Sequence, residues 1–262
     1  MLLSIITVNL NNIEGLLRTA QSIVDQTYKR FEWIVVDGGS TDGSKDVMET
    51  YTSHITKSVS EKDSGIYNAM NKGIRMSNSE YCLFLNSGDT FSSEDALERL
   101  SKNELGQDII YFNRLTKDGS GDYILKYPHT LSFYFFFTAN LNHQSCIIKK
   151  SAFEKYGFYD ETYKISADWM QMVIAVCKYQ CSYKYIDSVF TIFERGGISS
   201  KAEISGTEER NHFIKNNFGL FYNDYKELVA LKSKHGAFVF KVANKMFSSK
   251  VLKKYRKLRT RK

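Results

Sequence analysis

Short blocks of apolar and polar residues alternate along the first half of the chain. Leu3–Val8 and Phe31–Val36 are apolar runs of strand length. Between them, apolar residues recur at helical spacing over Ile13–Val24, and Asn11 with Glu14 three positions later resembles a capping box with Asn11 as the cap. Strands and helices that alternate at this spacing predict an α/β fold with a mostly parallel sheet flanked by helices.

The same alternation continues to about residue 115 and then changes. The pattern predicts a short helix over Ile66–Ile74 and strands over Tyr81–Leu85 and Asp108–Phe112. Beyond it the chain is irregular and rich in aromatic residues, with the run Phe133–Phe137 as either core packing or a lipid-facing wall. Helical patterns return in two stretches, 202–217 and 224–232.

This organisation predicts one catalytic domain in two halves, followed by a helical segment. We expect residues 1–115 to form the ligand-binding half and residues 116–200 an acceptor-side half of the same domain. Residues 201–262 would form C-terminal helices with a basic tail. The start of the chain lacks a basic region and a cleavage site, so we interpret it as a first strand and not as a signal peptide.

The positive charge of the chain is concentrated at its C-terminal end. The net charge is +7, but residues 241–262 hold ten Lys and Arg and no acidic residue, which leaves −3 for residues 1–240. Phe240, Phe247, Val251 and Leu258 recur there at helical intervals. This pattern favours a basic helix on an anionic membrane surface over a solvated tail, and it does not favour nucleic acid, because the aromatic residues form no stacking platform. The four cysteines lack a zinc-binding arrangement and indicate reduced, cytoplasmic thiols.

Polar clusters follow three of the predicted strands, at the edge where an open parallel sheet binds ligands. They are Thr7-Val8-Asn9, Asp37-Gly38-Gly39-Ser40 and Asn86-Ser87-Gly88-Asp89. Each alone is explained by turn formation, but three at one sheet edge favour a binding site. The chain has neither a dinucleotide-binding Gly-x-Gly-x-x-Gly nor a P-loop, so a divalent cation held by Asp89 is the natural partner for a diphosphate.

Four ordered segments resemble those of glycosyltransferase family two, which has the GT-A fold. They are Ser4–Asn11, Val36–Ser44, Glu61–Gly73 and Phe84–Asp89, and a looser match extends to about residue 200. The forms Asp-Gly-Gly-Ser and Asn-Ser-Gly-Asp resemble a subgroup that builds bacterial surface polysaccharides of the O-antigen and colanic acid type.

The resemblance implies roles for individual residues. Thr7 and Val8 would line the nucleotide pocket, with Asn9, Gly38, Ser87 and Gly88 beside them in the strand-end clusters, and Asp37 and Asp63 would hold the base and ribose. Asp89 would bind Mn²⁺ or Mg²⁺, and Asp168 would be the general base that takes a proton from the acceptor hydroxyl.

Several positions depart from the family pattern. Many relatives have Asp where Gly38, Asn86 and Gly88 stand, which predicts weaker contacts with base and metal. Met70 occupies a position that is often Arg, and Lys72 is the residue that would replace its phosphate contact.

For each of three residues, the sequence allows two interpretations. His143 contacts the acceptor or a phosphate, or else is a structural hydrogen-bonding residue. Arg195 belongs to a loop that closes over the diphosphate, or to a plain turn. Asp168 is the general base, or else a helix cap.

We therefore expect an inverting, metal-dependent glycosyltransferase that uses a UDP-hexose or UDP-N-acetylhexosamine. Its acceptor would be a lipid-diphosphate-linked saccharide at the inner face of the bacterial cytoplasmic membrane. The alternative is a nucleotide-sugar-binding protein of the same fold without transferase activity, and the departures in the metal motif make it reasonable.

Overall fold

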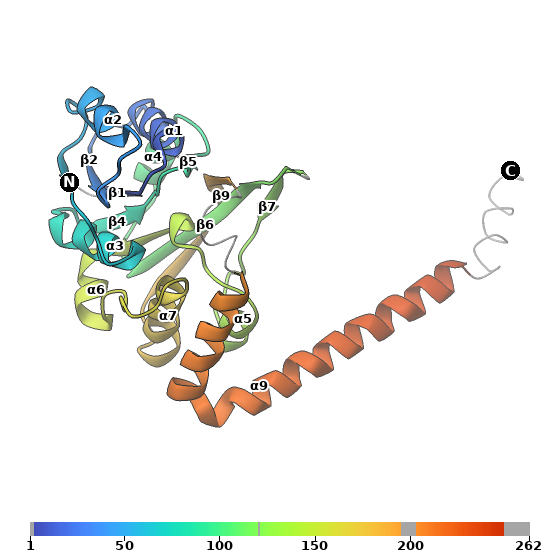
Figure 1. Ribbon diagram of the computed structural model, residues 1–262. Helices are drawn as coiled ribbons and strands as arrows, with labels where there is room; N and C mark the ends of the chain where they lie inside the picture. The colour runs from blue at the N-terminus through green and yellow to red at the C-terminus, as the bar shows by residue number, and fades with distance from the viewer. Residues whose placement is uncertain (1–2, 120, 195–202, 249–262) are drawn as a thin grey trace, which may run out of the picture. The chain divides into compact units, whose positions relative to one another are not determined.

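Nine strands form a single sheet in the computed structural model, which describes residues 3–119, 121–194 and 203–248 (Figure 1). The strands are β1 (Leu3–Asn9), β2 (Phe31–Asp37), β3 (Lys57–Ser60), β4 (Tyr81–Phe84), β5 (Thr90–Phe91), β6 (Ile109–Lys117), β7 (Tyr123–Leu125), β8 (Cys146–Lys149) and β9 (Tyr183–Glu194). The helices are α1 (Ile13–Val24), α2 (Ser44–Thr50), α3 (Ile66–Met76), α4 (Ala96–Ser101), α5 (Phe133–Thr138), η1 (His143–Ser145), α6 (Lys150–Tyr156), α7 (Ala167–Val173), η2 (Ile174–Lys178) and α9 (Glu203–Ser248).

The sheet has the order β3-β2-β1-β4-β8-β6-β9-β5, with β7 paired to β6. Its first four strands are parallel, as the alternating pattern predicts. The second half departs from a parallel sheet, because β8 runs antiparallel between β4 and β6, and β5 and β7 are also antiparallel to their neighbours. The α/β class is confirmed, and the second half of the sheet is mixed.

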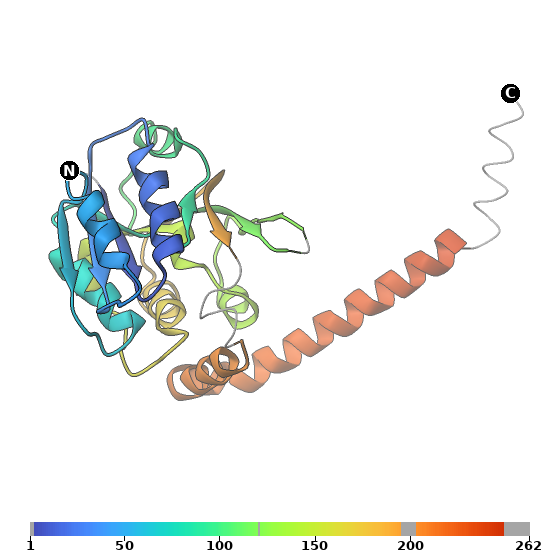
Figure 2. The same cartoon turned by 45° about the horizontal axis from the view of Figure 1, so that its top comes forward.

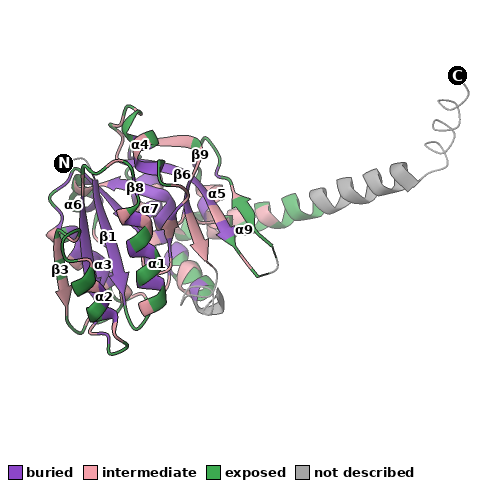
Figure 3. Cartoon of the chain, turned by 90° about the horizontal axis from the view of Figure 1, so that it is seen from above, coloured by how far each residue is buried: buried purple, intermediate pink, exposed green. Residues whose placement is uncertain are grey.

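Helices cover both faces of the parallel strands. On one face, α1 and α2 lie side by side over β1 and β2 (Figure 2), and α4 belongs to the same core. On the other face, α3 packs so closely that a Cβ on Gly73 would lie 2.3 Å from Cγ2 of Ile6. All seven residues of β1 are buried, as a strand covered on both sides requires (Figure 3).

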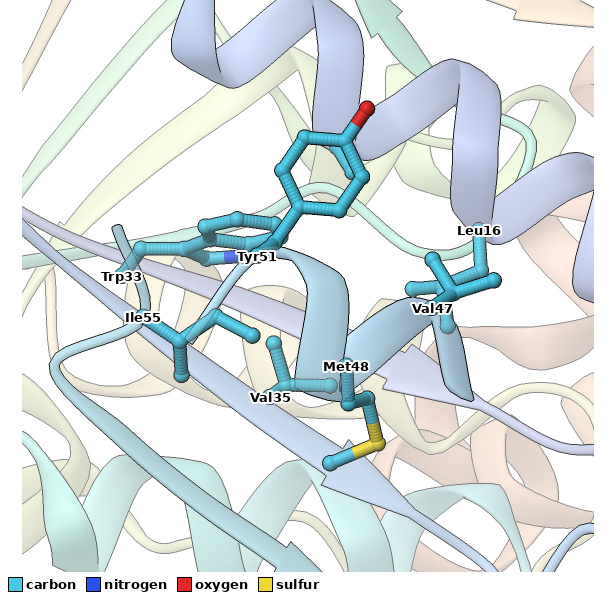
Figure 4. A pocket seen from close by; sticks show the side chains of 8 residues that line it. Leu16, Trp33, Val35, Val47, Met48, Tyr51 and Ile55 are labelled. Atoms are coloured by element: carbon cyan, nitrogen blue, oxygen red, sulfur yellow. The ribbon is translucent and has the colours of Figure 1, made fainter. Parts of the chain in front are cut away.

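The contact between α1, α2 and β2 is apolar. Leu16, Trp33, Val47 and Tyr51 face one another there (Figure 4), and the Trp33 and Tyr51 rings meet edge to face with centroids 6.2 Å apart. The residual space among these side chains is about 150 Å³, part of it open to solvent. It belongs to the hydrophobic core and holds no polar groups suited to a nucleotide.

The predicted cap of the first helix is wrong by one residue. Asn12 is the N-cap, and its Oδ1 accepts a hydrogen bond of 3.2 Å from the Gly15 N–H. Asn11 instead has φ of 47° and accepts a hydrogen bond from the Thr41 N–H at 2.9 Å. Asn tolerates this left-handed conformation better than most residues. The Asn11 side chain therefore hydrogen-bonds to the loop that contains Thr41, and Asn12 caps the helix.

The C-terminal region has the two helices that the sequence predicts over 202–217 and 224–232. The segment α9 consists of two helices that meet at a kink at Phe218 (φ −138°, ψ 32°), and the second helix continues beyond the predicted stretch to Ser248. The chain divides into two compact units after Asn211, whereas the boundaries at residues 115 and 200 stay predictions. Within the described residues, no helix is long and apolar enough to cross a membrane. Arg195 and the side chains of 241–262 lie outside the described residues.

The aromatic run forms α5 and gives a mixed result. Phe136 is 1% exposed, whereas the other aromatic residues of the run are half-buried. The four cysteines are free thiols, and three of them are buried.

Candidate active site

The three polar clusters meet at the carboxyl ends of β1, β2 and β4, as the sequence predicts. Asn9 is paired in register with Asp37, and its Nδ2 donates to Asp37 Oδ1 at 2.8 Å. Its Oδ1 accepts a hydrogen bond of 2.7 Å from the Ser87 hydroxyl. Asn9 is 1% exposed and joins the three strand ends into one polar site.

Asp37 is the most heavily hydrogen-bonded carboxylate of this site. It accepts side-chain hydrogen bonds from Asn9, Ser40 and Ser60, and backbone hydrogen bonds from Gly39 and Ser40. Burial would raise the pKa of Asp37, but these donors hold it below its ordinary value. Its contacts order the turn after β2, and its predicted contact with the base stays a prediction.

Thr7 and Val8 lie within β1 and are buried. Thr7 Oγ1 accepts a hydrogen bond of 3.0 Å from Trp33 Nε1. Their predicted place in the nucleotide pocket stays a prediction.

Asp63 has a more open carboxylate than Asp37. Its Oδ1 accepts a hydrogen bond of 3.0 Å from the Gly65 N–H. Its Oδ2 lies 2.7 Å from the position that a Cβ on Gly38 would occupy. Gly38 is therefore the residue that lets the Asp63 carboxylate lie over the turn, which gives a physical reason for its departure from the family pattern.

Thr19 of α1 positions the loop that carries Asp89, and the sequence analysis did not identify it. Its Oγ1 is within hydrogen-bonding distance of the carbonyl oxygens of Asp89 (2.8 Å) and Asn86 (3.3 Å), and it accepts from the Gly88 N–H at 3.0 Å. Thr19 is completely buried. One hydroxyl thus contacts three residues of the candidate metal loop.

Gly88 has φ of +106°, a conformation that side chains rarely adopt. An Asp at this position would strain the loop. The glycine therefore matches the backbone of the loop.

Asp89 is 7% exposed, and no side chain that the structure describes donates a hydrogen bond to its carboxyl group. Burial raises its pKa to about 6, although His143, Arg114 and the Asn86 backbone act in the opposite direction. A buried carboxylate without side-chain donors has lone pairs available for a cation. Among the described residues, no group of three or more His, Cys, Asp or Glu could hold a metal, so any cation here needs oxygens from a ligand or from water.

The predicted base and the metal loop are connected by His143. Its Nδ1 lies 2.8 Å from Asp168 Oδ2, and its Nε2 lies 3.2 Å from Asn86 Nδ2. These distances fit a ring that donates to Asp168 and accepts from the Asn86 amide, a tautomer assigned from the network. His143 thus has two hydrogen-bonding contacts within the protein, and its predicted contact with the acceptor or a phosphate stays a prediction.

Asp168 lies in the first turn of α7 but is not its cap. The N-cap is Ser166, whose hydroxyl donates to the Gly206 carbonyl at 3.2 Å. Burial would raise the pKa of Asp168, but the hydrogen bonds from His143 and Tyr67 hold it below its ordinary value. Because its pKa is lowered, the carboxylate is ionised at neutral pH. The side chain is 15% exposed, so an acceptor can still reach it.

Tyr67 of α3 is a second residue that the sequence analysis missed. Its hydroxyl lies 3.0 Å from Asp168 Oδ1 and 2.6 Å from the Ile165 carbonyl oxygen. Burial raises its pKa, and the Asp168 charge adds to this. Tyr67 therefore keeps its proton and shares it in hydrogen bonds with the Ile165 carbonyl and the Asp168 carboxylate, which stays charged.

Lys72 is engaged within the protein. Its Nζ lies 2.7 Å from Glu61 Oε1, and its side chain is 23% exposed. The predicted contact with a phosphate would require this ion pair to open, and it stays a prediction.

Comparisons with known proteins agree with this geometry. The family model "Glycosyl transferase family 2" matches residues 4–158. An uncharacterized glycosyltransferase of Mycobacterium tuberculosis is 31% identical over 207 residues, which cover 77% of this chain and 78% of the relative. The putative teichuronic acid biosynthesis glycosyltransferase TuaG of Bacillus subtilis is 28% identical over 139 residues, covering 50% of this chain and 55% of the relative.

Two solved structures are similar in fold. TarS 1–349 of S. aureus in complex with UDP-GlcNAc has a TM-score of 0.65 at 15% identity, covering 85% of this chain and 73% of that one. The mannosyltransferase PcManGT of Pyrobaculum calidifontis, in complex with GDP-Man and Mn²⁺, has a TM-score of 0.61 at 15% identity, covering 82% and 64%. Because the family model matches more than half of its residues, this chain belongs to glycosyl transferase family 2, and it has the GT-A fold.

Proposed function

We propose that the protein transfers a sugar from a UDP-hexose or UDP-N-acetylhexosamine to a hydroxyl of a lipid-diphosphate-linked saccharide, with inversion at the anomeric carbon. The observation that carries the proposal is the chain of contacts Asp168–His143–Asn86, which connects a carboxylate base to the loop of Asp89. The UDP-GlcNAc complex of TarS supports the donor class. The name of the B. subtilis relative supports a role in surface polysaccharide synthesis.

Asp168 is suited to remove the acceptor proton. Each carboxylate oxygen has two lone pairs, and the hydrogen bonds from Tyr67 and His143 use one on each oxygen. A lone pair therefore remains for the acceptor hydroxyl. Because the two donors fix both oxygens, the carboxylate is oriented before the acceptor binds, which lowers the cost of reaching a reactive geometry.

Asp89 is suited to hold Mn²⁺ or Mg²⁺ together with the donor diphosphate. Its carboxylate is buried and receives no side-chain hydrogen bond from the described residues. When bound, the cation would supply positive charge that stabilises the departing diphosphate. Thr19 holds the backbone of this loop through its hydroxyl, so the position of Asp89 does not depend on the ligand.

The acceptor class implies a protein that works at a membrane, and we propose that it is peripheral on the inner face of the cytoplasmic membrane. The ten basic residues of 241–262 support this, because each basic residue near an anionic leaflet contributes about 1 kcal/mol of binding. Deleting 241–262 should release the protein from anionic vesicles in a flotation assay and leave transfer to a short soluble acceptor intact. Equal flotation of the truncated and full-length proteins would contradict this part of the proposal.

The test of the proposed reaction is Asp168→Asn, assayed by release of UDP with the acceptor present. Asn keeps the size of the side chain but cannot take the proton, so turnover should fall by about 10²–10⁴-fold while UDP-sugar affinity stays unchanged. Asp160→Asn is the matched control, because Asp160 is exposed and accepts only local hydrogen bonds from Thr162. Normal turnover of folded Asp168→Asn would refute the base, and retention of the anomeric configuration in the product would refute the single displacement.

A further inference from the structure

Arg114 of β6 is a buried arginine without a hydrogen-bonded partner among the described residues. It is 6% exposed, and its Nε is buried and unpaired. Its guanidinium lies over the Phe193 ring, 4.5 Å from the centroid, which fixes the plane of the group. Burying a charge without a partner is costly, so such a guanidinium is expected to have an anionic ligand.

The sheet places Arg114 close to the candidate metal loop. Arg114 is paired in register with Thr191 of β9, and Thr191 is paired with Phe91 of β5. Phe91 follows Asp89 by two residues. Arg114 acts electrostatically on Asp89, yet no guanidinium nitrogen is within the 4.0 Å of an ion pair. The two buried charges therefore do not neutralise each other directly.

Other buried polar atoms beside this pair also lack partners within the described residues. Asn86 Oδ1 and Gln144 Oε1 accept no hydrogen bond there. Gln144 and Arg114 both adjoin Thr191, because the Gln144 carbonyl accepts a hydrogen bond of 3.0 Å from Thr191 Oγ1 and Arg114 is paired with Thr191 in the sheet. Buried polar groups in folded proteins are nearly always satisfied, so unpaired ones on segments next to the Asp89 loop indicate a polar ligand.

We infer that Arg114 binds an oxyanion of the nucleotide-sugar donor beside Asp89, with Asn86 and Gln144 accepting hydrogen bonds from that donor. This inference rests on the proposed function and adds the residue that recognises the charge of the donor. The oxyanion has two possible sources that share one chemistry. It is either the diphosphate, which every donor carries, or a carboxylate on the transferred sugar, which only a uronic acid carries.

The test compares Arg114→Gln with the parent protein by calorimetric titration of uridine, UDP, UDP-GlcNAc and UDP-glucuronic acid, each with Mn²⁺. Loss of a charged hydrogen bond should weaken binding by about 10- to 100-fold. If the diphosphate is the ligand, affinity falls for the three diphosphates and not for uridine. If a sugar carboxylate is the ligand, it falls for UDP-glucuronic acid alone. Arg99→Gln, at a half-exposed arginine paired with Asp95, is the matched control and should change nothing.

Unchanged affinity of folded Arg114→Gln for all four compounds would overturn the inference and leave the proposed function intact. Failure of the parent protein to bind UDP and both UDP-sugars would overturn the UDP donor, and the inference with it. A purely structural role would weaken uridine and UDP equally, which also contradicts the inference. Arg114→Lys provides a second variant if Arg114→Gln does not fold. It keeps the charge but loses the planar fork, so it should show the same pattern with a smaller loss.

Discussion

Replacing Asp89 by Asn should make the ligand-free protein more stable while it removes metal-dependent nucleotide binding. The pKa of Asp89 rises from 3.8 to about 6 on folding, because burial disfavours the charged form. Stability that depends on this carboxyl group is therefore fully present below about pH 4 and is lost as the pH rises through 6. Above that pH, the buried charge costs about 3 kcal/mol, since one pKa unit corresponds to about 1.4 kcal/mol.

The assay is urea unfolding in EDTA at several pH values between 5 and 8. At pH 8, Asp89→Asn should exceed the parent by up to about 3 kcal/mol, and the difference should shrink toward pH 5 as the parent carboxyl takes up a proton. Asp168→Asn is the control of opposite sign, because hydrogen bonds lower the pKa of that carboxyl group. It should destabilise the protein at pH 8.

Adding Mn²⁺ with UDP should reverse the order of stability, because ligand stabilises the parent by mass action and has no carboxylate to bind through in Asp89→Asn. An Asp89→Asn protein that is no more stable than the parent at pH 8, or a difference that does not change with pH, would show that the buried charge carries no such cost. The ionised Asp89 carboxylate would then not destabilise the ligand-free protein.

Three further predictions concern residues that shape the site and the sheet. Thr19→Val should weaken Mn²⁺-dependent UDP binding measured by calorimetry, because the hydroxyl contacts three residues of the Asp89 loop; binding at parental affinity would contradict this role. Gly88→Ala should cost about 1–2 kcal/mol in urea unfolding, since its φ of +106° strains any side chain, and Gly106→Ala, with open space around it, should be nearly neutral. Glu32→Gln should destabilise the protein at pH 7 by about 1–3 kcal/mol. Burial would raise the pKa of Glu32, but its hydrogen bonds lower it, so its contribution is lost as the pH falls, and a defect that persists unchanged at low pH would refute the reasoning.

The sequence could predict the site where its residues come from strand ends. Asn9, Asp37 and Asn86 follow apolar runs, and the parallel order of β1, β2 and β4 brings such ends to one edge of the sheet. The antiparallel insertion of β8 could not be predicted, because a buried strand has the same apolar pattern in either direction.

The residues that position the candidate catalytic groups have no comparable signal in the sequence. Thr19 lies in α1 among the buried Leu16, Ala20 and Ile23, so its position in the pattern is that of a core residue. Tyr67 likewise occupies the buried face of α3. In both cases the functional atom is one hydroxyl, and its partner comes from a segment that is 67 or more residues away. No local pattern records such a contact.

Gly38 and Gly88 show why the departures from the family pattern do not indicate a lost activity. An aspartate at either position would add a carboxylate, and on charge alone it would be expected to strengthen the site. At Gly38, however, a new side chain would displace the Asp63 carboxylate, whose Oδ2 lies 2.7 Å from the Cβ position. At Gly88 it would have to adopt φ of +106° in a loop already held by Thr19. Each glycine thus allows a neighbouring carboxylate, Asp63 or Asp89, to keep its place.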